Sequence, residues 1–365
     1  MPTKKIANPS GDLTHTGKKR TTPIFGANPI VSPKRVDAEQ VSVVVFDYDE
    51  NTIAELRFNN VMECLRFKTS NRVSWINIDG LRKEDVEAVC NHYGVHQLIA
   101  EDILSENQRP KMDEGDGVLF CLLNMLYFNT KEACVETEQV SIVLGNQFVI
   151  SFQEDAGRDV FDPIRTKLQI PNSKLRQRAA DYLCYTMLDL IVDNYFLVME
   201  QLGEQIESLE EEIIRRSTSR SLARINQLRK ELIVLKRNIV PVRELINGFV
   251  NNESDLIDER TTKYYKDVHD HIIQANDLTE NYRDIMMGMQ DLYINNVNLK
   301  MNEVMKVMAI VTCLLAPATV IGGMFGMNFD NIPFAHNRWG FYIMVFVMLV
   351  IPVWMLAMFK RRGWF

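Results

Sequence analysis

Two long stretches near the C-terminal end contain no charged side chain, and they constrain the fold more than any other feature. They cover residues 307–329 and 339–359, which is 23 and 21 residues. A helix needs about 20 apolar residues to cross the roughly 30 Å hydrocarbon core of a bilayer. Only helices and closed barrels satisfy their backbone groups in lipid, and neither stretch has the alternation of a barrel strand. We therefore predict two transmembrane helices.

The charges around these stretches predict how the chain is oriented. The link between the two stretches carries only Asp330 and Arg338. The segments before the first stretch and after the second carry five basic residues. Because cytoplasmic flanks are enriched in Lys and Arg, we predict a multi-pass protein of the cell (inner) membrane with both termini in the cytoplasm. The basic flanking residues are Lys300, Lys306, Lys360, Arg361 and Arg362.

The N-terminal part is typical of a water-soluble domain. Residues 1–36 are basic and rich in Pro and Thr, without the apolar run of a secretory signal, and we predict a disordered tail. Residues 37–175 predict a cytoplasmic α/β domain with a mixed or antiparallel sheet, including a hairpin across Gly145-Asn146 and a helix at 82–94 that ends at Gly94. The predicted strands are 41–47, 73–78, 117–128, 138–144 and 147–152.

The rest of the chain has helical periodicity. Residues 176–261 predict two long antiparallel helices, and residues 262–306 predict a stalk helix that continues into the span 307–329. The link 330–338 forms an outer loop, 339–359 the second span and 360–365 a basic cytoplasmic tail. The predicted fold class is an α+β membrane protein: a cytoplasmic α/β domain, a long helical stalk and two C-terminal transmembrane helices.

One stripe of the stalk helix continues into the first span in steps of three and four residues, so its members share a helix face. The stripe is polar in the stalk and small or hydroxylated in the span. One chain with two spans cannot enclose a channel, but several copies with this face inward could. Close helix packing explains small residues equally well, and periodicity leaves both interpretations open. The stripe comprises Asp291, Asn295, Asn298, Asn302, Met305, Ala309, Thr312, Ala316, Thr319 and Gly323.

The end of the first span carries a short motif with well-matched surroundings. Gly326-Met327-Asn328 follows Phe325 and resembles the signature of the CorA family of magnesium/cobalt transporters. "NEVMKVMAIV" (302–311), Pro317, the short outer loop and the basic tail resemble the family too, as do "VHQLIAEDILSENQRPK" (95–111) and "YYKDVHDHIIQANDLTENYRDI" (264–285). The resemblance covers about residues 40–365. It implies a homopentamer with a funnel-shaped cytoplasmic domain, in which the first span lines the pore and the second lies outside it.

The resemblance implies that Gly326, Met327 and Asn328 form the selectivity filter. Magnesium holds its octahedral water shell tightly, and neutral Asn328 carboxamides would accept hydrogen bonds from that shell. Because the first span has no carboxylate, a bound ion could also leave. Met305 and Met308 would form an apolar constriction. The chain departs from the family pattern at Ala316, where a bulkier residue is common, and in the outer loop, which lacks a glutamate.

The resemblance also implies that Asp102 and Asp267 hold a regulatory divalent cation between neighbouring subunits. Two apposed carboxylates repel each other unless a cation lies between them, so a filled site would clamp the subunits and close the pore. The local alternative is that Asp102 caps a helix and Asp267 belongs to a solvated helix face.

These observations predict a passive, magnesium-gated divalent cation channel that mediates Mg²⁺ influx, with Co²⁺ and Ni²⁺ as further ions. The sequence has no Walker loop, G-x-S-x-G or dinucleotide fingerprint, and we expect neither an enzyme nor an organic cofactor. The expected partners are further copies of the chain, the lipid bilayer and divalent cations, with Mg²⁺ as transported and regulatory ion, and no nucleic acid. Alternatives are a zinc or proton-coupled transporter of the same architecture, or a non-conducting membrane-anchored coiled-coil protein. The coiled coil predicts an apolar stripe, which Asp291, Asn295, Asn298 and Asn302 interrupt.

Overall fold

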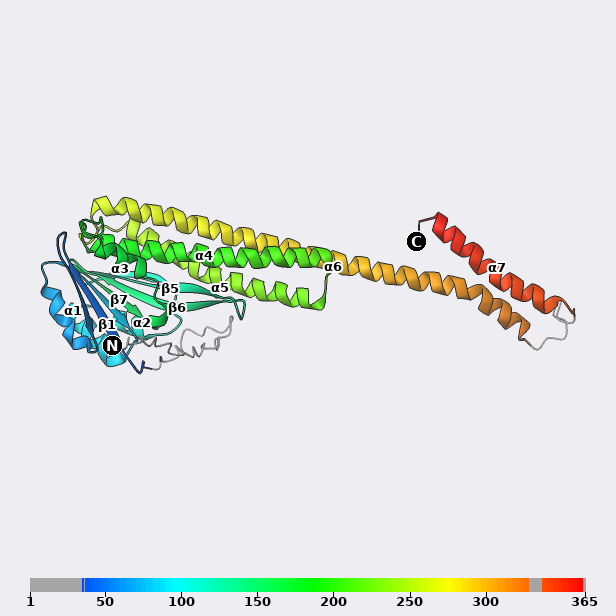
Figure 1. The fold of residues 1–365 in the computed structure, drawn as a ribbon, viewed down its shortest axis with the longest axis horizontal. Coiled ribbons are helices and arrows are strands. Elements are labelled where there is room, and N and C mark those ends of the chain that lie inside the picture. The colour runs from blue at the N-terminus through cyan, green and yellow to red at the C-terminus, as the bar shows by residue number, and fades with distance from the viewer. Residues whose placement is uncertain (1–34, 36, 328–336, 364–365) are drawn as a thin grey trace, which may run out of the picture. The chain divides into compact units, whose positions relative to one another are not determined.

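A computed structural model describes residue 35, residues 37–327 and residues 337–363 (Figure 1). The chain divides into two compact units. The first unit comprises the chain up to Glu211 together with Ala223–Met287, and the second comprises Glu212–Leu222 together with the chain from Gly288 onward. Three long helices run through both: α4 (Ala180–Arg215), α5 (Ser219–Val250) and α6 (Glu259–Phe325).

The first unit is built on a seven-stranded mixed sheet, so the chain has the predicted α+β class. The strand order is β2-β1-β3-β7-β6-β5-β4, in which β3 and β7 are parallel and the other neighbours are antiparallel. The predicted hairpin across Gly145-Asn146 is confirmed, because Ser141 pairs with Phe152 and the Gly145 N–H donates to the Phe148 carbonyl at 2.9 Å. The strands are β1 (Ser42–Tyr48), β2 (Ile53–Phe58), β3 (Val73–Asp79), β4 (Lys111–Gly115), β5 (Val118–Asn129), β6 (Cys134–Leu144) and β7 (Phe148–Gln153).

Two short helices, α1 (Lys83–Tyr93) and α2 (Gln97–Leu104), cover one face of the sheet (Figure 1). Alternate residues of the central strands point to them because side chains in a strand alternate between the faces. Gly94 ends α1 as predicted, with the positive φ of 81° that glycine adopts without strain. The shared core includes Val43, Val45, Ile76, Ile78, Ile150 and Phe152 from the sheet and Val86, Val89, Ile99 and Ile103 from the helices.

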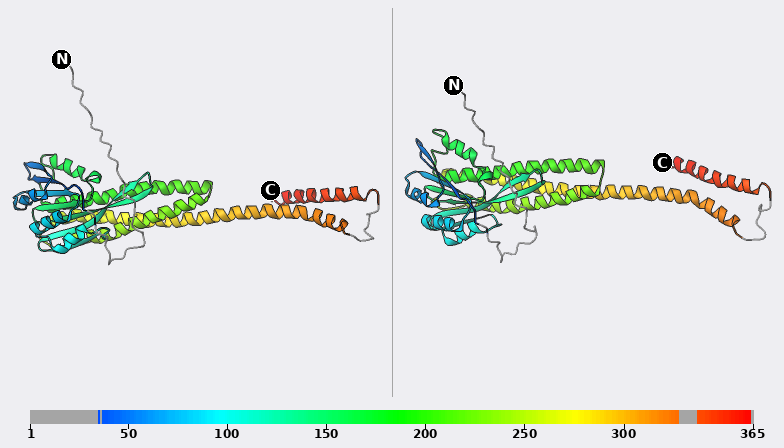
Figure 2. Two further views of the ribbon diagram at one scale, coloured as in Figure 1. Left: turned by 90° about the horizontal axis from the view of Figure 1, so that it is seen from below. Right: turned by 60° about the horizontal axis from the view of Figure 1, so that its bottom comes forward.

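The parts of the long helices that belong to the first unit, together with α3 (Asp162–Gln169), lie on the opposite face (Figure 2). Trp75 of β3 packs edge-on against Phe161, the residue before α3, with the two ring centroids 5.9 Å apart. On α4, Tyr195 donates from its hydroxyl to the Asn124 carbonyl of β5 at 2.6 Å. Phe249 of α5 stacks on Tyr265 of α6 at 5.0 Å. These contacts fix α4, α5 and the first part of α6 as one helical layer. Three 3-10 helices complete the unit: η1 (Val61–Glu63), η2 (Leu65–Thr69) and η3 (Ala156–Arg158).

The second unit is mainly helical. α6 is one continuous helix of 67 residues that contains both the predicted stalk and residues 307–325 of the first predicted span, and α7 (Gly340–Arg361) contains most of the second. Among the described residues, three helices are long and apolar enough to cross a membrane: α4, α6 and α7. The most apolar part of α4 is 61% buried within the chain, against 6% for α6 and 0% for α7. Packing against the sheet and the neighbouring helices therefore accounts for the apolar residues of α4, whereas the apolar parts of α6 and α7 are almost entirely exposed in the single chain.

Candidate functional site

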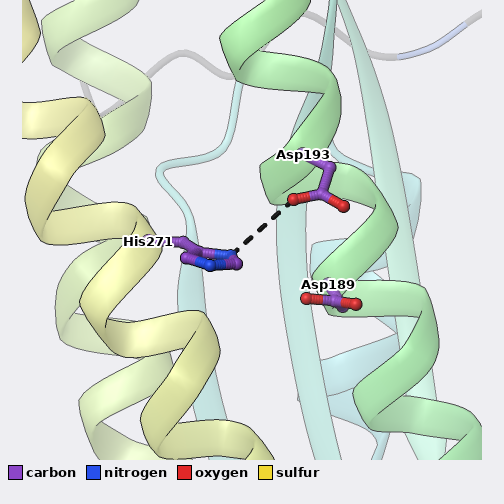
Figure 3. A group of neighbouring side chains, drawn as sticks. All are labelled: Asp189, Asp193 and His271. Atoms are coloured by element: carbon purple, nitrogen blue, oxygen red, sulfur yellow. Dashed lines mark ion pairs between the residues drawn. The ribbon is translucent and has the colours of Figure 1, made fainter.

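Three potential metal ligands face each other across α4 and α6 in the first unit (Figure 3). Asp189 and Asp193 are four residues apart, so they share one face of α4. His271 projects toward them from α6, with its Nδ1 3.7 Å from Asp193 Oδ1. One ligand atom from each residue lies within 4.8 Å of the other two. We call Asp189, Asp193 and His271 the cation cluster.

The electrostatics of the cation cluster favour a positive charge. Burial raises the pKa of Asp189, and the neighbouring carboxylate of Asp193 raises it further. Asp267, one turn before His271 on α6, also raises this pKa, while a hydrogen bond from the Tyr185 hydroxyl at 3.3 Å lowers it. Repulsion between neighbouring carboxylates falls when a cation lies among them.

His271 supplies the nitrogen of the cluster. Its Nδ1 is buried and has no hydrogen-bond partner among the described residues. The ring of Phe196 lies edge-on to the imidazole, with the two ring centroids 6.5 Å apart. A neutral imidazole with a free ring nitrogen is a metal ligand. The set of two carboxylates and one imidazole suits Zn²⁺, Co²⁺ and Ni²⁺ directly, and Mg²⁺ through its carboxylate oxygens and bound water.

Asp102 and Asp267, the two predicted regulatory residues, lie on different elements of the chain. Asp102 is in the last turn of α2, where its Oδ2 accepts from Lys111 Nζ at 2.6 Å. Lys111 also pairs with Asp113 at 2.8 Å. Burial lowers the pKa of Lys111, but the hydrogen bonds and charges of Asp102 and Asp113 outweigh that effect and raise it. The residue that caps α2 is His96, whose side chain accepts from the Leu98 N–H. Asp267 is exposed beside the cation cluster.

Sequence reasoning singled out Asp267 but missed Asp189, Asp193 and His271. The available signal was a pair of four-residue spacings, Asp189 to Asp193 and Asp267 to His271, each of which puts two ligands on one helix face. Neither spacing says that the two faces meet.

The predicted pore-lining residues of α6 are exposed in the single chain. Thr312 Oγ1 donates to the Met308 carbonyl at 2.9 Å, and Thr319 Oγ1 donates to the Leu315 carbonyl at 3.0 Å. Each hydroxyl proton is thus used inside the helix, and the oxygen keeps its capacity to accept hydrogen bonds from water. The exposed residues are Asp291, Asn295, Asn298, Asn302, Met305, Met308, Thr312, Ala316, Thr319 and Gly323.

The predicted filter begins where α6 ends. The Gly326 N–H donates to the carbonyls of Gly322 and Gly323 at 3.0 and 3.2 Å. A Cβ on Gly326 would lie 3.3 Å from the Gly322 oxygen, so a larger residue would crowd this last turn. Met327 follows with an N–H bond to the Met324 carbonyl at 3.4 Å. Asn328, the last span residue Phe329 and residues 330–336 of the predicted outer loop lie outside the described residues.

Comparisons with known proteins agree with this architecture. Residues 70–361 match the family model described as CorA-like Mg2+ transporter protein. A cobalt/magnesium transport protein CorA from Thermotoga maritima is 36% identical over 357 residues, which cover 98% of this chain and 96% of that protein. The complete structure of the CorA magnesium transporter from Methanocaldococcus jannaschii superimposes with a TM-score of 0.73 at 22% identity, covering 88% of this chain and 98% of that one. A zinc transport protein ZntB from Yersinia pseudotuberculosis is 22% identical over 304 residues, 80% of this chain and 87% of that protein.

Proposed function

Because the chain belongs to the CorA family of divalent cation transporters, we propose that it is a passive channel that admits Mg²⁺ to the cytoplasm and closes when cytoplasmic Mg²⁺ is high. The observation that carries the proposal is the exposed stripe of α6, which runs from carboxylate and carboxamide groups into hydroxylated and small residues. Hydrated Mg²⁺ gives up its water reluctantly. A surface of neutral oxygen acceptors suits an ion that travels with its water.

The channel is a homopentamer with α6 around the axis and α7 outside it. Five copies follow from membership of the family, and one observation supports an assembly: residues 299–309 of α6 are exposed on every side in the single chain. Exposed apolar side chains all round a helix require lipid or other helices as neighbours. Leu299, Val304 and Val307 are among them, at 66%, 62% and 54% exposure.

Within the pore, Gly326, Met327 and Asn328 form the filter, and Met305 and Met308 form the constriction. Their apolar side chains are more than half exposed and would meet across the axis. An apolar ring of this kind closes a pore by excluding water. No energy-coupling step is needed, because a potential of 100 mV drives a doubly charged cation inward by about 4.6 kcal/mol.

Regulation resides in the first unit. The cation cluster, together with Asp267 and with Asp102 of a neighbouring subunit, binds cytoplasmic divalent cations and favours the closed state. This assignment rests on the like charges gathered at Asp189 and Asp193, which a cation would relieve. Depletion of Mg²⁺ would restore the repulsion, loosen the subunits and open the pore.

The basic residues at the end of α7 support a topology in which both termini of the proposed channel lie in the cytoplasm and residues 330–338 lie outside. A cysteine placed at Ala335 should then react with an impermeant thiol reagent added to intact cells. Labelling only after lysis would contradict this topology.

The direct test is ion flux into liposomes that contain the purified protein. We expect Mg²⁺ to enter along its gradient without added nucleotide or a proton gradient, with Co²⁺ and Ni²⁺ also carried. Internal Mg²⁺ should lower the initial rate. Absence of Mg²⁺ flux, or flux that requires a proton gradient, would refute the passive channel.

A second candidate function is transport of zinc or a similar transition metal. His271 favours it, since an imidazole in the cation cluster suits Zn²⁺ better than Mg²⁺. The same liposome assay separates the candidates: the zinc transporter would carry Zn²⁺ faster than Mg²⁺ at equal concentration.

A further inference from the structure

The turn between α4 and α5 is bonded to α6 shortly before the apolar part of α6. Lys300 Nζ donates to the Ser217 carbonyl at 2.9 Å. Asn296 Nδ2 donates to the Ile213 carbonyl and to Ser217 Oγ, both at 3.1 Å. Ile213 is fully buried and Ser217 is 8% exposed. We call these four residues the latch; all of them lie in the second unit.

The latch bonds satisfy groups that the end of α4 would otherwise leave open. The last four carbonyls of a helix have no partner within it, and α4 ends at Arg215. Ile213 is among these last residues, and its carbonyl accepts from Asn296 and also from Ser217 Oγ at 3.1 Å. The Lys300 ammonium lies at the negative end of the α4 dipole, which favours a cation. Separation of the latch would therefore expose carbonyls and lose a favourable charge.

The turn itself is held together by its own hydrogen bonds. Ser221 Oγ donates to Glu212 Oε1 at 2.7 Å and lies 3.0 Å from Thr218 Oγ1. The Arg216 N–H donates to the Glu212 carbonyl at 2.8 Å. A turn bonded internally in this way moves as one piece, so a displacement of α4 is passed to the latch rather than absorbed by a loose loop.

On α6, the latch adjoins the predicted pore stripe. Asn296 and Lys300 are four residues apart and share one face. Asn295 and Asn298 of the stripe point toward the opposite side of the same rigid helix, because successive residues of a helix are rotated by about 100°. A turn that moves Asn296 and Lys300 therefore rotates or shifts the stripe with them.

The same two helices carry the cation cluster. α4 bears Asp189 and Asp193 and also Ile213, and α6 bears His271 and also Asn296. We propose that Asn296 and Lys300 are positioning residues that transmit the cation-bound state of α4 to the pore stripe of α6. This inference rests on the proposed magnesium-regulated channel. It assigns to the latch the coupling between binding and closure, and to neither residue a contact with the transported ion.

The test combines Asn296→Ala with Lys300→Met in the full-length protein. We measure initial flux as a function of internal Mg²⁺ in liposomes. Coupling energies between sites commonly correspond to 5- to 150-fold changes, and we expect the half-closing Mg²⁺ concentration to rise at least about fivefold. Maximal flux and the order of ion preference should stay at wild-type values. The single variant Lys300→Arg, with Asn296 intact, should keep the wild-type half-closing Mg²⁺ concentration, because the guanidinium can still donate to the Ser217 carbonyl. Val297→Ala, a truncation one residue from Asn296, is the matched control and should change nothing.

A second measurement does not depend on transport. Arg216 in the turn and Arg220 in the first turn of α5 are exposed and offer trypsin sites. In the wild type, Mg²⁺ should slow cleavage there, and in the double variant the cleavage rate should no longer depend on Mg²⁺. A wild type with no magnesium-dependent flux but with magnesium-dependent cleavage that the double variant abolishes would refute the proposed channel and leave the latch standing. An unchanged half-closing concentration, or unchanged protection by Mg²⁺, in the double variant would overturn the latch.

Discussion

α4 and α7 are both apolar helices of sufficient length to cross a bilayer, yet α4 is largely buried within the chain and α7 is exposed. The most apolar part of α4 is 61% buried within the chain, whereas that of α7 is 0% buried. The difference is visible in their charges: α4 carries Asp181, Asp189 and Asp193 along its length, while α7 has no charge before Lys360. Hydrophobicity alone thus does not identify a span; an uninterrupted uncharged surface does.

The two units also differ in the charge, burial and spacing of their oxygen-bearing side chains. In the first unit, carboxylates are gathered and partly buried: burial and the neighbouring carboxylate of Asp193 raise the pKa of Asp189, and such a gathering of like charges favours a bound cation. In the second unit, the oxygen groups of Asn302, Thr312 and Thr319 are exposed, neutral and spread along one helix. Gathered charge holds a divalent ion, whereas spaced neutral acceptors let it pass. The proposed function assigns sensing to the first arrangement and conduction to the second.

The largest effect should come from the conducting side of this comparison. Asn328→Ala removes the carboxamide that is proposed to accept hydrogen bonds from the ion's water shell, while it changes little packing volume. We expect Mg²⁺ flux into liposomes to be abolished and the oligomer to remain intact by size-exclusion chromatography. Asn337→Ala, in the predicted outer loop and outside the filter motif, serves as the control and should conduct normally. Wild-type flux from the Asn328→Ala variant would show that Asn328 is not part of the filter.

A pair of leucine truncations tests the difference in burial. Leu188 of α4 is fully buried against the sheet, and Leu349 of α7 is 65% exposed. Loss of a buried leucine costs about 2–5 kcal/mol because a cavity remains. Leu188→Ala should therefore lower the thermal midpoint of the first unit, followed by circular dichroism in detergent, and Leu349→Ala should leave that midpoint unchanged. Equal effects of the two variants would mean that α7 is packed as α4 is.

The sequence predicted the central strands and the spans, because their patterns are uniform. The edge strands were missed for a physical reason. β2 carries Glu55 and Arg57, and β4 carries Asp113 and Glu114. Charged residues protect an exposed sheet edge from pairing with other chains. The same charges interrupt the alternating apolar pattern by which a strand is predicted from sequence.

The cation cluster was only half predictable. Helical spacing predicts that Asp189 and Asp193 share a face, but not which face of another helix they meet. That choice depends on long-range packing, such as Tyr265 of α6 stacked on Phe249 of α5. The latch was hidden for the same reason: its acceptors on Ile213 and Ser217 include backbone carbonyls, which no sequence pattern marks.

Buried carboxyl groups of the first unit predict a pH dependence of stability. Glu138 of β6 is 4% exposed, and burial raises its pKa to about 7. Its folded form therefore holds a proton more tightly than the unfolded chain does, so its stabilising contribution is complete at low pH and is lost as pH rises through about 7. We expect this group alone to cost about 2 kcal/mol between pH 5 and pH 8.

The measurement compares thermal unfolding of the wild type and Glu138→Gln across that pH range. The neutral amide imitates the protonated acid and can still accept from the N–H groups of Glu154 and Asp155, which now lie 3.1 and 3.0 Å from Glu138 Oε1. The variant should lose less stability than the wild type on going to pH 8. Parallel curves would show that Glu138 titrates as it does in the unfolded chain.

The smallest effect in this series concerns the sensing side. Asp267→Asn removes one negative charge beside the cation cluster but keeps the size of the side chain. Asp267 is exposed, so water screens its charge and the expected loss is modest, about a tenfold weaker response to Mg²⁺. Flux should then persist at internal Mg²⁺ concentrations that silence the wild type. Protection of the first unit against proteolysis by Mg²⁺ should weaken in proportion, because the same bound cation causes both.

Asp277→Asn provides the matched control, since Asp277 is also an exposed aspartate of α6 but lies outside the cation cluster. It should alter neither flux nor proteolysis. If Asp267→Asn also kept the wild-type magnesium dependence of both, Asp267 would have no part in sensing. The cation cluster would then have to act through Asp189, Asp193 and His271 alone. The conducting stripe would be untouched by that result, because its residues belong to the other unit and, apart from the single carboxylate of Asp291, contribute neutral groups rather than gathered charge.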